Sequence, residues 1–415
     1  MALTTTTVVL IAVLATALAT TLGVVAVHAL TSSGNTVAAG SSGPGSTATS
    51  TTTTTTTLPA ALAGGPSQSH APVFAIGGGE QPGYGNFNGV TCSDTTDCFA
   101  VGADDHGAGV ASLSTDGGTS WVNSTLPAGT PVLDAVACSD TSHCVAVGQG
   151  VIATTANQGA NWSLKAVPTA NTTLIGASCP SSTLCMASGI IDNPTGPYAG
   201  AVERSTDGGS TWKAATLPAG TLGIGDVVCP SATDCIAAGA SLLVSHDGGA
   251  TWATTTVPRG TGQLRTVSCS SATTCVAIGP NQQGVVDPDA VANAVETTDG
   301  GDTWSTITLP AGTASVDQIS CASTSQCVAA GISPKAGGSA PFYRSSDGGT
   351  TWATAAAPSG VSAIAALSCP AANQCAVVGR QGNGTPTTSA STDLANWSTT
   401  PLSGDAIPPS KDAVS

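Results

Sequence analysis

The residues best placed for chemistry are the cysteines, which form seven pairs with five residues inside each pair. The pairs are Cys92/Cys98, Cys138/Cys144, Cys179/Cys185, Cys229/Cys235, Cys269/Cys275, Cys321/Cys327 and Cys369/Cys375. Two cysteines that flank a short turn can face each other across antiparallel strands, at a separation that a disulfide accepts. The spacing predicts seven disulfides in an oxidising compartment, with buried free thiols as the alternative. No second Cys or His pair has zinc-like spacing beside them, so we expect no metal and no cofactor.

A second repeated phrase follows each cysteine pair and ends in tryptophan. Its clean form, Ser/Thr-x-Asp-Gly-Gly-x-Ser/Thr-Trp, occurs five times, first at Ser114 to Trp121. The Asp carboxylate can accept backbone N–H groups within a turn, glycine permits positive φ, and the tryptophan can bury a large apolar area. We expect these turns to be structural. The residues concerned are Asp116, Trp121, Asn157, Trp162, Asp207, Trp212, Asp247, Trp252, Asp299, Trp304, Asp347, Trp352, Asp393 and Trp397.

The two phrases recur with a period of 40 to 52 residues, which is typical of a propeller or a solenoid. In the first copy, we expect strands at 89–92, 98–102, 109–114 and 120–126, because apolar residues alternate or run between Gly-rich turns. The second strand begins with the second cysteine in this reading, so in the last copy it runs from Cys375 to Gly379. An apolar residue two positions before each first cysteine should share its face. Four antiparallel strands per copy make one propeller blade. The sequence therefore predicts an all-β, seven-bladed β-propeller over residues 71–403.

The tryptophan phrase resembles the Asp-box, or bacterial neuraminidase repeat. That repeat occurs in sialidase-like glycosidases, sortilin-type receptors and photosystem II assembly-factor-like propellers. The resemblance covers about 325 residues, and it implies a propeller fold. It says little about function, because in those families the Asp-box lies away from the active site.

The segments outside the repeats predict export. Residues 1–30 contain an uncharged apolar stretch at 8–30, long enough for a signal peptide or a membrane anchor, and the sequence leaves the two open. Residues 31–70 are Thr/Ser-rich and low in complexity, and we expect a disordered linker there and a disordered tail at 404–415. The apolar run 72–76 is able to add a strand to the last blade. We expect an extracellular monomer, secreted or anchored.

The composition of the chain limits the kinds of partner that it could bind. Charged residues make up 8% of the chain and the net charge is −15. A nucleic-acid ligand requires a basic surface, so nucleic acid is excluded. Scarcity of Glu, Lys and Arg also argues against a helical solenoid.

Loop lengths indicate where a ligand would bind. The spacing from each tryptophan to the next first cysteine is always 17 residues, whereas that from the second cysteine to the tryptophan ranges from 17 to 29. All length variation therefore lies between the second and third strands, and variable loops on a rigid scaffold commonly carry function. The ligand candidates in or near those loops are Asp104, Asp105, His106, Asp192, Tyr198, Glu203, Arg204, Arg265, Asp287, Asp289, Tyr343, Arg344 and Arg380. Asp287 and Asp289 alone are too few for a calcium shell.

Three functions remain open, one of them a purely structural or adhesive surface protein. We expect a non-enzymatic binding or scaffold module, displayed on a stalk, that holds a protein or a glycan on the variable loops. The alternative is a sialidase-like glycoside hydrolase, which needs a pair of carboxyl groups and, in sialidases, an arginine triad. The chain has five arginines and three glutamates, and every tryptophan belongs to a turn. Glu203-Arg204 and Tyr343-Arg344 are the suggestive pairs.

Overall fold

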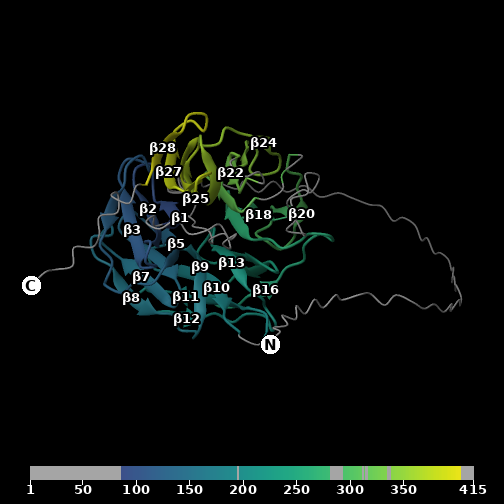
Figure 1. Cartoon of the computed structure of the whole chain (residues 1–415). Coiled ribbons are helices and arrows are strands. Elements are labelled where there is room, and N and C mark those ends of the chain that lie inside the picture. Colours follow the sequence, from purple (N-terminus) through teal and green to yellow (C-terminus); the bar gives the residue numbers. More distant parts are fainter. Residues whose placement is uncertain are drawn as a thin grey trace, which may run out of the picture. The chain divides into compact units, whose positions relative to one another are not determined.

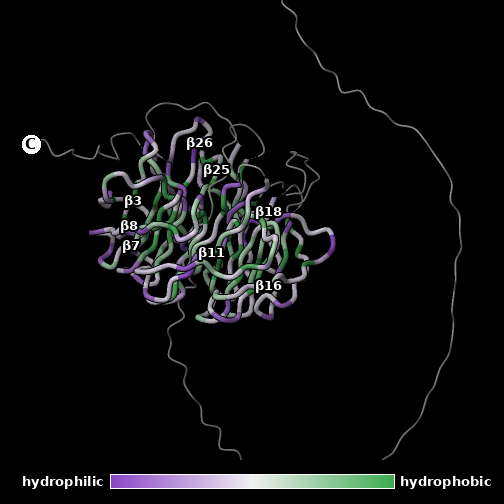
Figure 2. Tube along the Cα trace, turned by 90° about the horizontal axis from the view of Figure 1, so that it is seen from below, coloured by the Kyte–Doolittle hydropathy of each residue, from purple (hydrophilic) through white to green (hydrophobic). Residues whose placement is uncertain are grey.

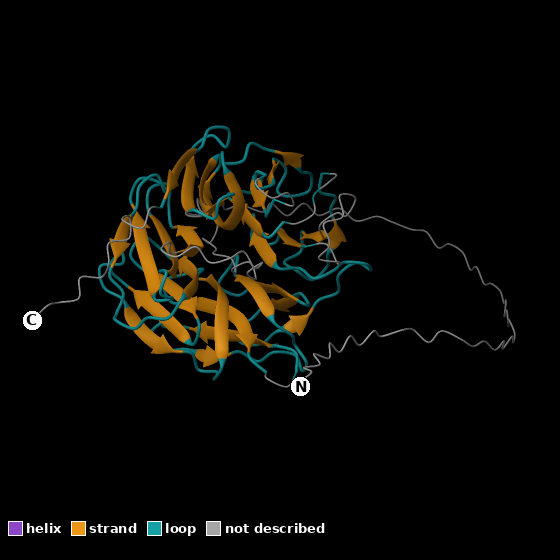
Figure 3. Ribbon diagram, viewed as in Figure 1, coloured by secondary structure: helices purple, strands orange, loops and turns teal. Residues whose placement is uncertain are grey.

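The computed structural model describes residues 86–193, 196–280, 293–310, 313, 316–333 and 338–402. The chain divides into two compact units, 1–58 and 59–415, and every described residue belongs to the second. Its strands form seven separate four-stranded antiparallel sheets, each built from one continuous segment (Figure 1). These sheets are blades 1 to 7 in chain order. The described residues contain strands and loops and no helix, hence none that could cross a membrane (Figure 3).

The innermost strand of each blade ends at or beside the first cysteine of its pair. These strands are β1 (Asn86–Cys92), β5 (Leu133–Cys138), β9 (Thr172–Ser178), β13 (Ile224–Val228), β17 (Thr266–Cys269), β21 (Gln318–Cys321) and β25 (Val361–Ala371). Each second strand begins at or beside the second cysteine. They are β2 (Cys98–Ala103), β6 (Cys144–Gly148), β10 (Cys185–Ile191), β14 (Cys235–Gly239), β18 (Cys275–Gly279), β22 (Cys327–Ala330) and β26 (Gln374–Gln381).

The third strands run up to the hydroxyl residue that opens the tryptophan phrase. They are β3 (Gly109–Ser114), β7 (Val151–Thr155), β11 (Ala199–Ser205), β15 (Leu243–Ser245), β19 (Asn293–Thr297), β23 (Phe342–Ser345) and β27 (Pro386–Ser391). The outermost strands are short and solvated. They are β4 (Val122–Ser124), β8 (Ser163–Ala166), β12 (Lys213–Ala214), β16 (Ala253–Thr254), β20 (Ser305–Thr306), β24 (Ala353–Thr354) and β28 (Ser398–Pro401). The expected strand at 120–126 was too long, because the turn extends through Trp121 and only three residues pair with β3.

The blades close into a ring through their innermost strands. Each of these strands contacts those of the blades before and after it, and β1 contacts both β5 and β25. A buried bond joins the two ends of the ring, since the Cys92 N–H donates to Ser368 Oγ at 2.9 Å. The same serine-to-cysteine bond joins blades 3 and 4, where the Cys229 N–H donates to Ser178 Oγ at 3.1 Å.

The hydrophobic core lies between neighbouring blades, not within each one. One cluster packs Phe99 of blade 1 against Leu133 and Trp162 of blade 2, and another packs Trp121 of blade 1 against blade 7. The apolar residue two positions before each first cysteine lies in the same cluster as that cysteine, as Val90 does with Cys92, which confirms the predicted shared face. Figure 2 shows the result, with hydrophobic strands inside and hydrophilic loops at the rim.

All seven predicted disulfides are formed, and the described chain has no free cysteine. In four blades, including blade 1, the two cysteines are direct cross-strand partners, and the Cα atoms of Cys92 and Cys98 are 3.9 Å apart. Seven disulfides indicate an oxidising environment.

The cysteine turn of blade 7 differs from that of blade 1. The sequence predicted that Cys375 opens the second strand, and this boundary was wrong, because β26 already begins at Gln374 and extends to Gln381. Gln374 pairs with Ala371, and the pairing register shifts between Ser368 and Ala371, so Cys369 and Cys375 are not direct cross-strand partners. Their Cα atoms still lie 4.1 Å apart, since both strands continue into the turn, and the predicted Cys369–Cys375 disulfide forms.

The tryptophan turns bind their own backbone as expected. In blade 3, Asp207 Oδ1 accepts the Thr211 N–H at 2.8 Å, and Trp212 Nε1 donates to the Gly209 carbonyl at 2.9 Å. Hydrogen bonds from the hydroxyl and N–H of Thr211 lower the pKa of Asp207 to about 2. In the last blade Leu394 replaces glycine and keeps a positive φ of 57°. The turn still forms there, because the N–H groups of three residues donate hydrogen bonds to the side chains of Asp393 or Ser391.

Candidate functional site

The strand order gives the ring two unlike ends. Because the strands of each blade are antiparallel and consecutive, the cysteine turn and the tryptophan turn lie at one end, which we call the constant end. The second-to-third-strand loop and the connection to the next blade lie at the other, the variable end. Apart from the tryptophan turn of blade 7, which is one residue shorter than the others, the differences in loop length fall on the variable end.

A cavity of about 600 Å³ opens at the variable end among blades 3, 4 and 5. We call it the blade-4 pocket. Blade 4 borders the pocket with a short loop, Ala240 to Leu242, between its second and third strands. In the sequence, the segment from the second cysteine to the tryptophan is longest in blades 5 and 3 and shortest in blade 4. Its lining is mainly apolar and includes Ile175, Ile190, Leu222, Ile224, Leu242, Val257 and Leu264.

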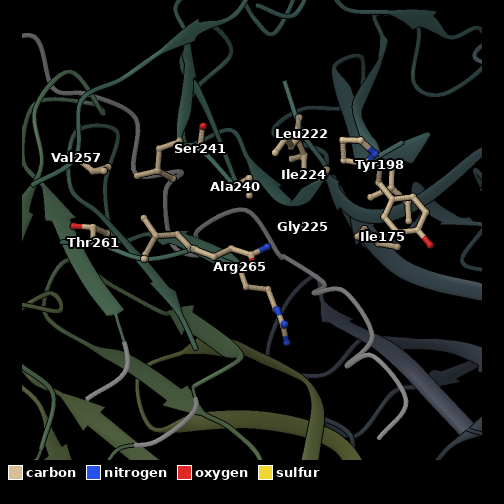
Figure 4. A pocket seen from close by; sticks show the side chains of 18 residues that line it. Ile175, Tyr198, Leu222, Ile224, Gly225, Ala240, Ser241, Val257, Thr261 and Arg265 are labelled. Carbon is tan, nitrogen blue, oxygen red and sulfur yellow. The ribbon is translucent and has the colours of Figure 1, made fainter. Parts of the chain in front are cut away.

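Two large apolar side chains on the pocket wall reach solvent. Tyr198 is 49% exposed and Leu222 is 44% exposed. Their backbones are fixed to each other, because the Gly223 N–H donates to the Tyr198 carbonyl at 3.2 Å and the Gly200 N–H donates to the Thr221 carbonyl at 2.9 Å. The long loop of blade 3 is therefore held against the connection that enters blade 4. Figure 4 shows Tyr198 on one side of the cavity and Val257 and Thr261 on the other.

Arg265 forms the inner margin of the pocket. Its Nη1 lies 2.9 Å from Asp317 Oδ1 of blade 6, whose side chain is 2% exposed. The pair fixes the guanidinium between the pocket and the innermost strands. Gly225 leaves room for this arrangement, because a Cβ at that position would lie 2.6 Å from the Arg265 carbonyl oxygen.

A belt of seven residues, four of them polar, lies in or just before the innermost strands, and sequence reasoning found only Arg265 among them. The residue four positions before each first cysteine sits at the same level in every blade, and the pairing register shifts beside it in five of them. These residues are Asn88, Asp134, Ile175, Gly225, Arg265, Asp317 and Ala365. Their constant spacing from the cysteine was a usable signal. We call them the inner belt.

Asp134 is the belt residue with the most perturbed acidity. Asn88 Nδ2 donates to its Oδ1 at 3.3 Å and to the Leu133 carbonyl at 3.1 Å. Burial raises the pKa of Asp134 to about 7, although the bond from Asn88 acts in the opposite direction. A carboxyl group in this state is partly protonated at neutral pH.

Among the sequence candidates, the structure brings Tyr198 and Arg265 together at the blade-4 pocket. Glu203 lies elsewhere. It is a residue of β11, fully buried between blades 2 and 3, and its Oε1 accepts the Thr169 N–H at 3.3 Å. Burial raises the pKa of Glu203. Its Oε2 has no protein partner among the described residues.

Three more candidates are strand residues and not loop residues. Arg204 of β11 donates from Nε to the Gly248 carbonyl at 2.6 Å, which places its head at the constant end. Tyr343 and Arg344 belong to β23, where Tyr343 is buried in the core and Arg344 is exposed. The strands of blades 3 and 6 run up to the turn serine, so the pairs Glu203-Arg204 and Tyr343-Arg344 are not brought together with the pocket.

The remaining candidates are spread around the variable end. Asp104 accepts the N–H groups of His106 and Ala108 in a tight turn, and His106 Nδ1 lies 2.6 Å from Asp105 Oδ1. Asp192 borders a second cavity of about 610 Å³ between blades 2 and 3.

Arg380 is exposed at the end of β26. Asp287, Asp289, the segment 8–30, the linker, the tail and the run 72–76 lie outside the described residues.

Neither a protein-family model nor a curated protein sequence matches this chain. Solved structures with a similar fold do exist. A GH74 xyloglucanase from Xanthomonas campestris has 17% identity and a TM-score of 0.54, with 79% of this chain aligned to 54% of that one. A YCF48 from Cyanidioschyzon merolae has 15% identity and a TM-score of 0.53, with 79% of this chain aligned to 98% of that one. A YCF48 bound to a D1 peptide has 17% identity and a TM-score of 0.52, with 75% of this chain aligned to 96% of that one.

These identities establish a shared fold. The chain is a seven-bladed β-propeller with four-stranded antiparallel blades, and its neighbours of this fold include both glycoside hydrolases and YCF48 proteins. This chain spans about half the length of the GH74 structures.

Proposed function

We propose that this protein is an exported Asp-box propeller that binds a polypeptide segment in the blade-4 pocket and performs no chemistry on it. One observation carries the proposal. Among the described residues, the large apolar side chains that are strongly exposed are Val122, Tyr198 and Leu222, and two of the three line this pocket. A rigid apolar concavity with exposed aromatic and aliphatic anchors is typical of a recognition site.

The chemistry of the lining favours an apolar polypeptide as the ligand. The pocket is walled by branched aliphatic side chains, and Tyr198 offers a large contact area that loses little conformational entropy on binding. Arg265 is already paired with Asp317, so it supplies a polar margin more than a free charge. The YCF48 structure bound to a D1 peptide is a propeller of this fold with a peptide ligand, which agrees with the proposal.

A glycoside hydrolase is the second candidate, because GH74 xyloglucanases share the fold. Glycoside hydrolysis uses two carboxyl groups about 5 to 9.5 Å apart beside the bond that breaks. The described lining of the blade-4 pocket contains no carboxylate, and Glu203 is buried between two blades. Turnover of chromogenic glycosides by the full chain, abolished by Asp192→Asn, would favour this candidate over binding.

The binding proposal is tested with an immobilised library of ten-residue peptides and the full-length protein. We expect apolar peptides to be retained, and Leu222→Asp to weaken their binding at least tenfold, because a charge in an apolar pocket loses its hydration. The matched control is Val122→Asp, since Val122 is 72% exposed on β4, outside the pocket. The proposal is wrong if no peptide binds, or if both variants lose binding equally.

A further inference from the structure

One phenylalanine of the chain stands apart from the other three. Phe87, Phe99 and Phe342 are all buried in the cores between blades. The fourth, Phe74, lies in the apolar run Pro-Val-Phe-Ala-Ile at 72–76, which is followed by nine residues, five of them glycine, before β1 begins. An apolar run of this kind favours a partner surface over water.

Blade 7 has no vacant position for this run. The sequence suggested that residues 72–76 add a strand to the last blade. That blade already contains β25, β26, β27 and β28, all from its own segment, and β28 pairs with β27 from Ser398 to Pro401. It has as many strands as the other six, so the run is not needed to complete the last blade.

The blade-4 pocket is within reach of the run. β1 begins at Asn86, and because β1 ends at the cysteine turn, Asn86 lies at the variable end. Asn86 is two residues from the inner-belt residue Asn88, and three inner-belt residues, Ile175, Gly225 and Arg265, line the pocket. The chain therefore leaves the blades at the level of the pocket's inner margin. The ten residues from Ile76 to Asn86 span at most about 33 to 36 Å, enough to cross the mouth of a small ring.

We propose that residues 72–76 occupy the blade-4 pocket as an intramolecular ligand, an inference that rests on the peptide-binding function proposed above. Val73, Phe74 and Ile76 supply the apolar side chains, and Phe74 packs against the exposed ring of Tyr198. The chain's own run then competes with any external partner. Tethering gives it an effective concentration in the millimolar range, so an external peptide of equal intrinsic affinity binds more weakly to the intact chain.

Proximity is tested with an engineered cysteine pair in the full chain. The fourteen native cysteines are all committed to disulfides, so Phe74→Cys with Leu222→Cys adds a single new pair. We expect an intramolecular disulfide between positions 74 and 222, identified by peptide mapping without reduction. Phe74→Cys with Val122→Cys is the control and should not cross-link, because Val122 lies on β4, beside the tryptophan turn. Failure to cross-link at position 222, or equal cross-linking at 122, overturns the proposal, and a cross-linked dimer would overturn it by assigning the run to a second copy.

Competition gives the functional test. The probe is a fluorescent peptide of residues 71–79, titrated into the full-length protein and into Phe74→Ser. We expect the peptide to bind Phe74→Ser at least tenfold more tightly, and Leu222→Asp in that background to remove the gain. Equal binding to both proteins overturns the intramolecular ligand and leaves the pocket as a peptide site. Failure of this peptide to bind either protein also overturns it, while the peptide library decides the proposed function separately.

Discussion

The constant end and the variable end of the ring are built from the same seven repeats, yet one end consists of uniform turns and the other of loops that differ in length. At the constant end, each turn satisfies its own polar groups, as Asp247 does by accepting the N–H groups of Ala250 and Thr251 at 2.9 Å. At the variable end, the loops between second and third strands differ in length, and the short loop of blade 4 borders the blade-4 pocket.

The difference shows how a repeat fold separates stability from recognition. The seven disulfides join the first and second strands of each blade near the constant end, and the tryptophan side chains pack in the cores between neighbouring blades. The loops of the variable end carry little of the core, so their lengths can change without loss of the ring. If this comparison is right, changes at the constant end and in the belt should affect stability, and changes in the pocket should affect binding.

The largest effect is expected from reducing the disulfides. Closing so short a loop contributes about 2 kcal/mol by the chain-entropy formula, and seven such contributions together rival the whole stability of a typical domain. The reduced and alkylated chain should therefore fail to refold at 25 °C, as followed by tryptophan fluorescence. Thiol counting under denaturation should give close to zero before reduction and fourteen after it. A reduced chain that stays folded would show that the cores alone hold the ring.

The next effect concerns pH and has opposite signs in the two regions. The pKa of Asp134 is raised to about 7 from an ordinary value of 3.8, so between about pH 4 and pH 7 the unfolded chain releases a proton that the folded chain retains. The contribution of Asp134 to stability therefore falls as the pH rises through that window. Asp134→Asn should be more stable than the native protein at pH 8, by on the order of 2 to 4 kcal/mol, and nearly equal to it at pH 4.

Asp247 provides the contrast for the constant end. Hydrogen bonds from the hydroxyl and N–H of Thr251 lower its pKa to about 2, so its contribution is present above about pH 4 and is lost as the pH falls towards 2. Asp247→Asn should therefore destabilise the protein at pH 8 and make little difference at pH 2. Urea denaturation of both variants at the paired pH values measures the two slopes. Slopes of the same sign would contradict the assignment.

Replacing either of two glycines by alanine should have a smaller effect on stability, and the two replacements can be compared directly. Gly249, in the tryptophan turn of blade 4, and Gly220, in the connection that enters blade 4, have φ values of 80° and 79°. An added Cβ at Gly249 would lie 2.3 Å from Met186 Cε, whereas at Gly220 nothing lies within 4 Å. Both changes to Ala carry the backbone cost of about 1 kcal/mol. Gly249→Ala adds about 1 kcal/mol of overpacking, because the flexible end of the buried Met186 side chain has to move. Thermal unfolding of the two variants checks this, and equal melting temperatures would exclude the overpacking.

The smallest effect on stability is expected in the pocket. Leu222 is 44% exposed, so Leu222→Ser should change the free energy of unfolding by no more than about 0.5 kcal/mol. The same change should weaken peptide binding, which separates recognition from folding. A loss of several kcal/mol in a denaturation curve would mean that the pocket wall is part of the core.

Much of the fold could be predicted from the sequence because the residue pattern of each repeat specifies its own strands and turns. A cysteine pair around a five-residue turn predicts two adjacent strands, and a hydroxyl, an aspartate and glycines before a tryptophan predict the next turn. Even the atypical copies kept their geometry, since Asn157 Oδ1 accepts the Asn161 N–H at 2.9 Å as the aspartates do elsewhere. The boundaries of the solvated outer strands were less certain, because few side chains there are buried. At Cys375 the boundary depended on a register shift, which the cysteine spacing does not reveal.

The candidate functional residues could be predicted from the sequence only in part. Loop length indicated the variable end, and Tyr198 and Arg265 were identified before the fold was known. Their sequence positions could not show that they line one pocket, nor that Glu203 is buried between blades. Asp134, in β5, and Asp317, just before β21, were missed because an acidic residue at such a position has no signature until its neighbours are placed.

The sequence by itself therefore determined the repeat, the disulfides and the end of the ring where variation collects, because these depend on residues close together in the chain. Only the tertiary structure decided which residues meet. Arg265 and Asp317 are 52 residues apart in the chain and come within 2.9 Å because the ring sets one blade beside the next. Tyr198, Leu222 and Arg265 share a pocket because blades 3, 4 and 5 lie side by side in the ring. Such contacts depend on the packing of one blade against another, which no local spacing specifies.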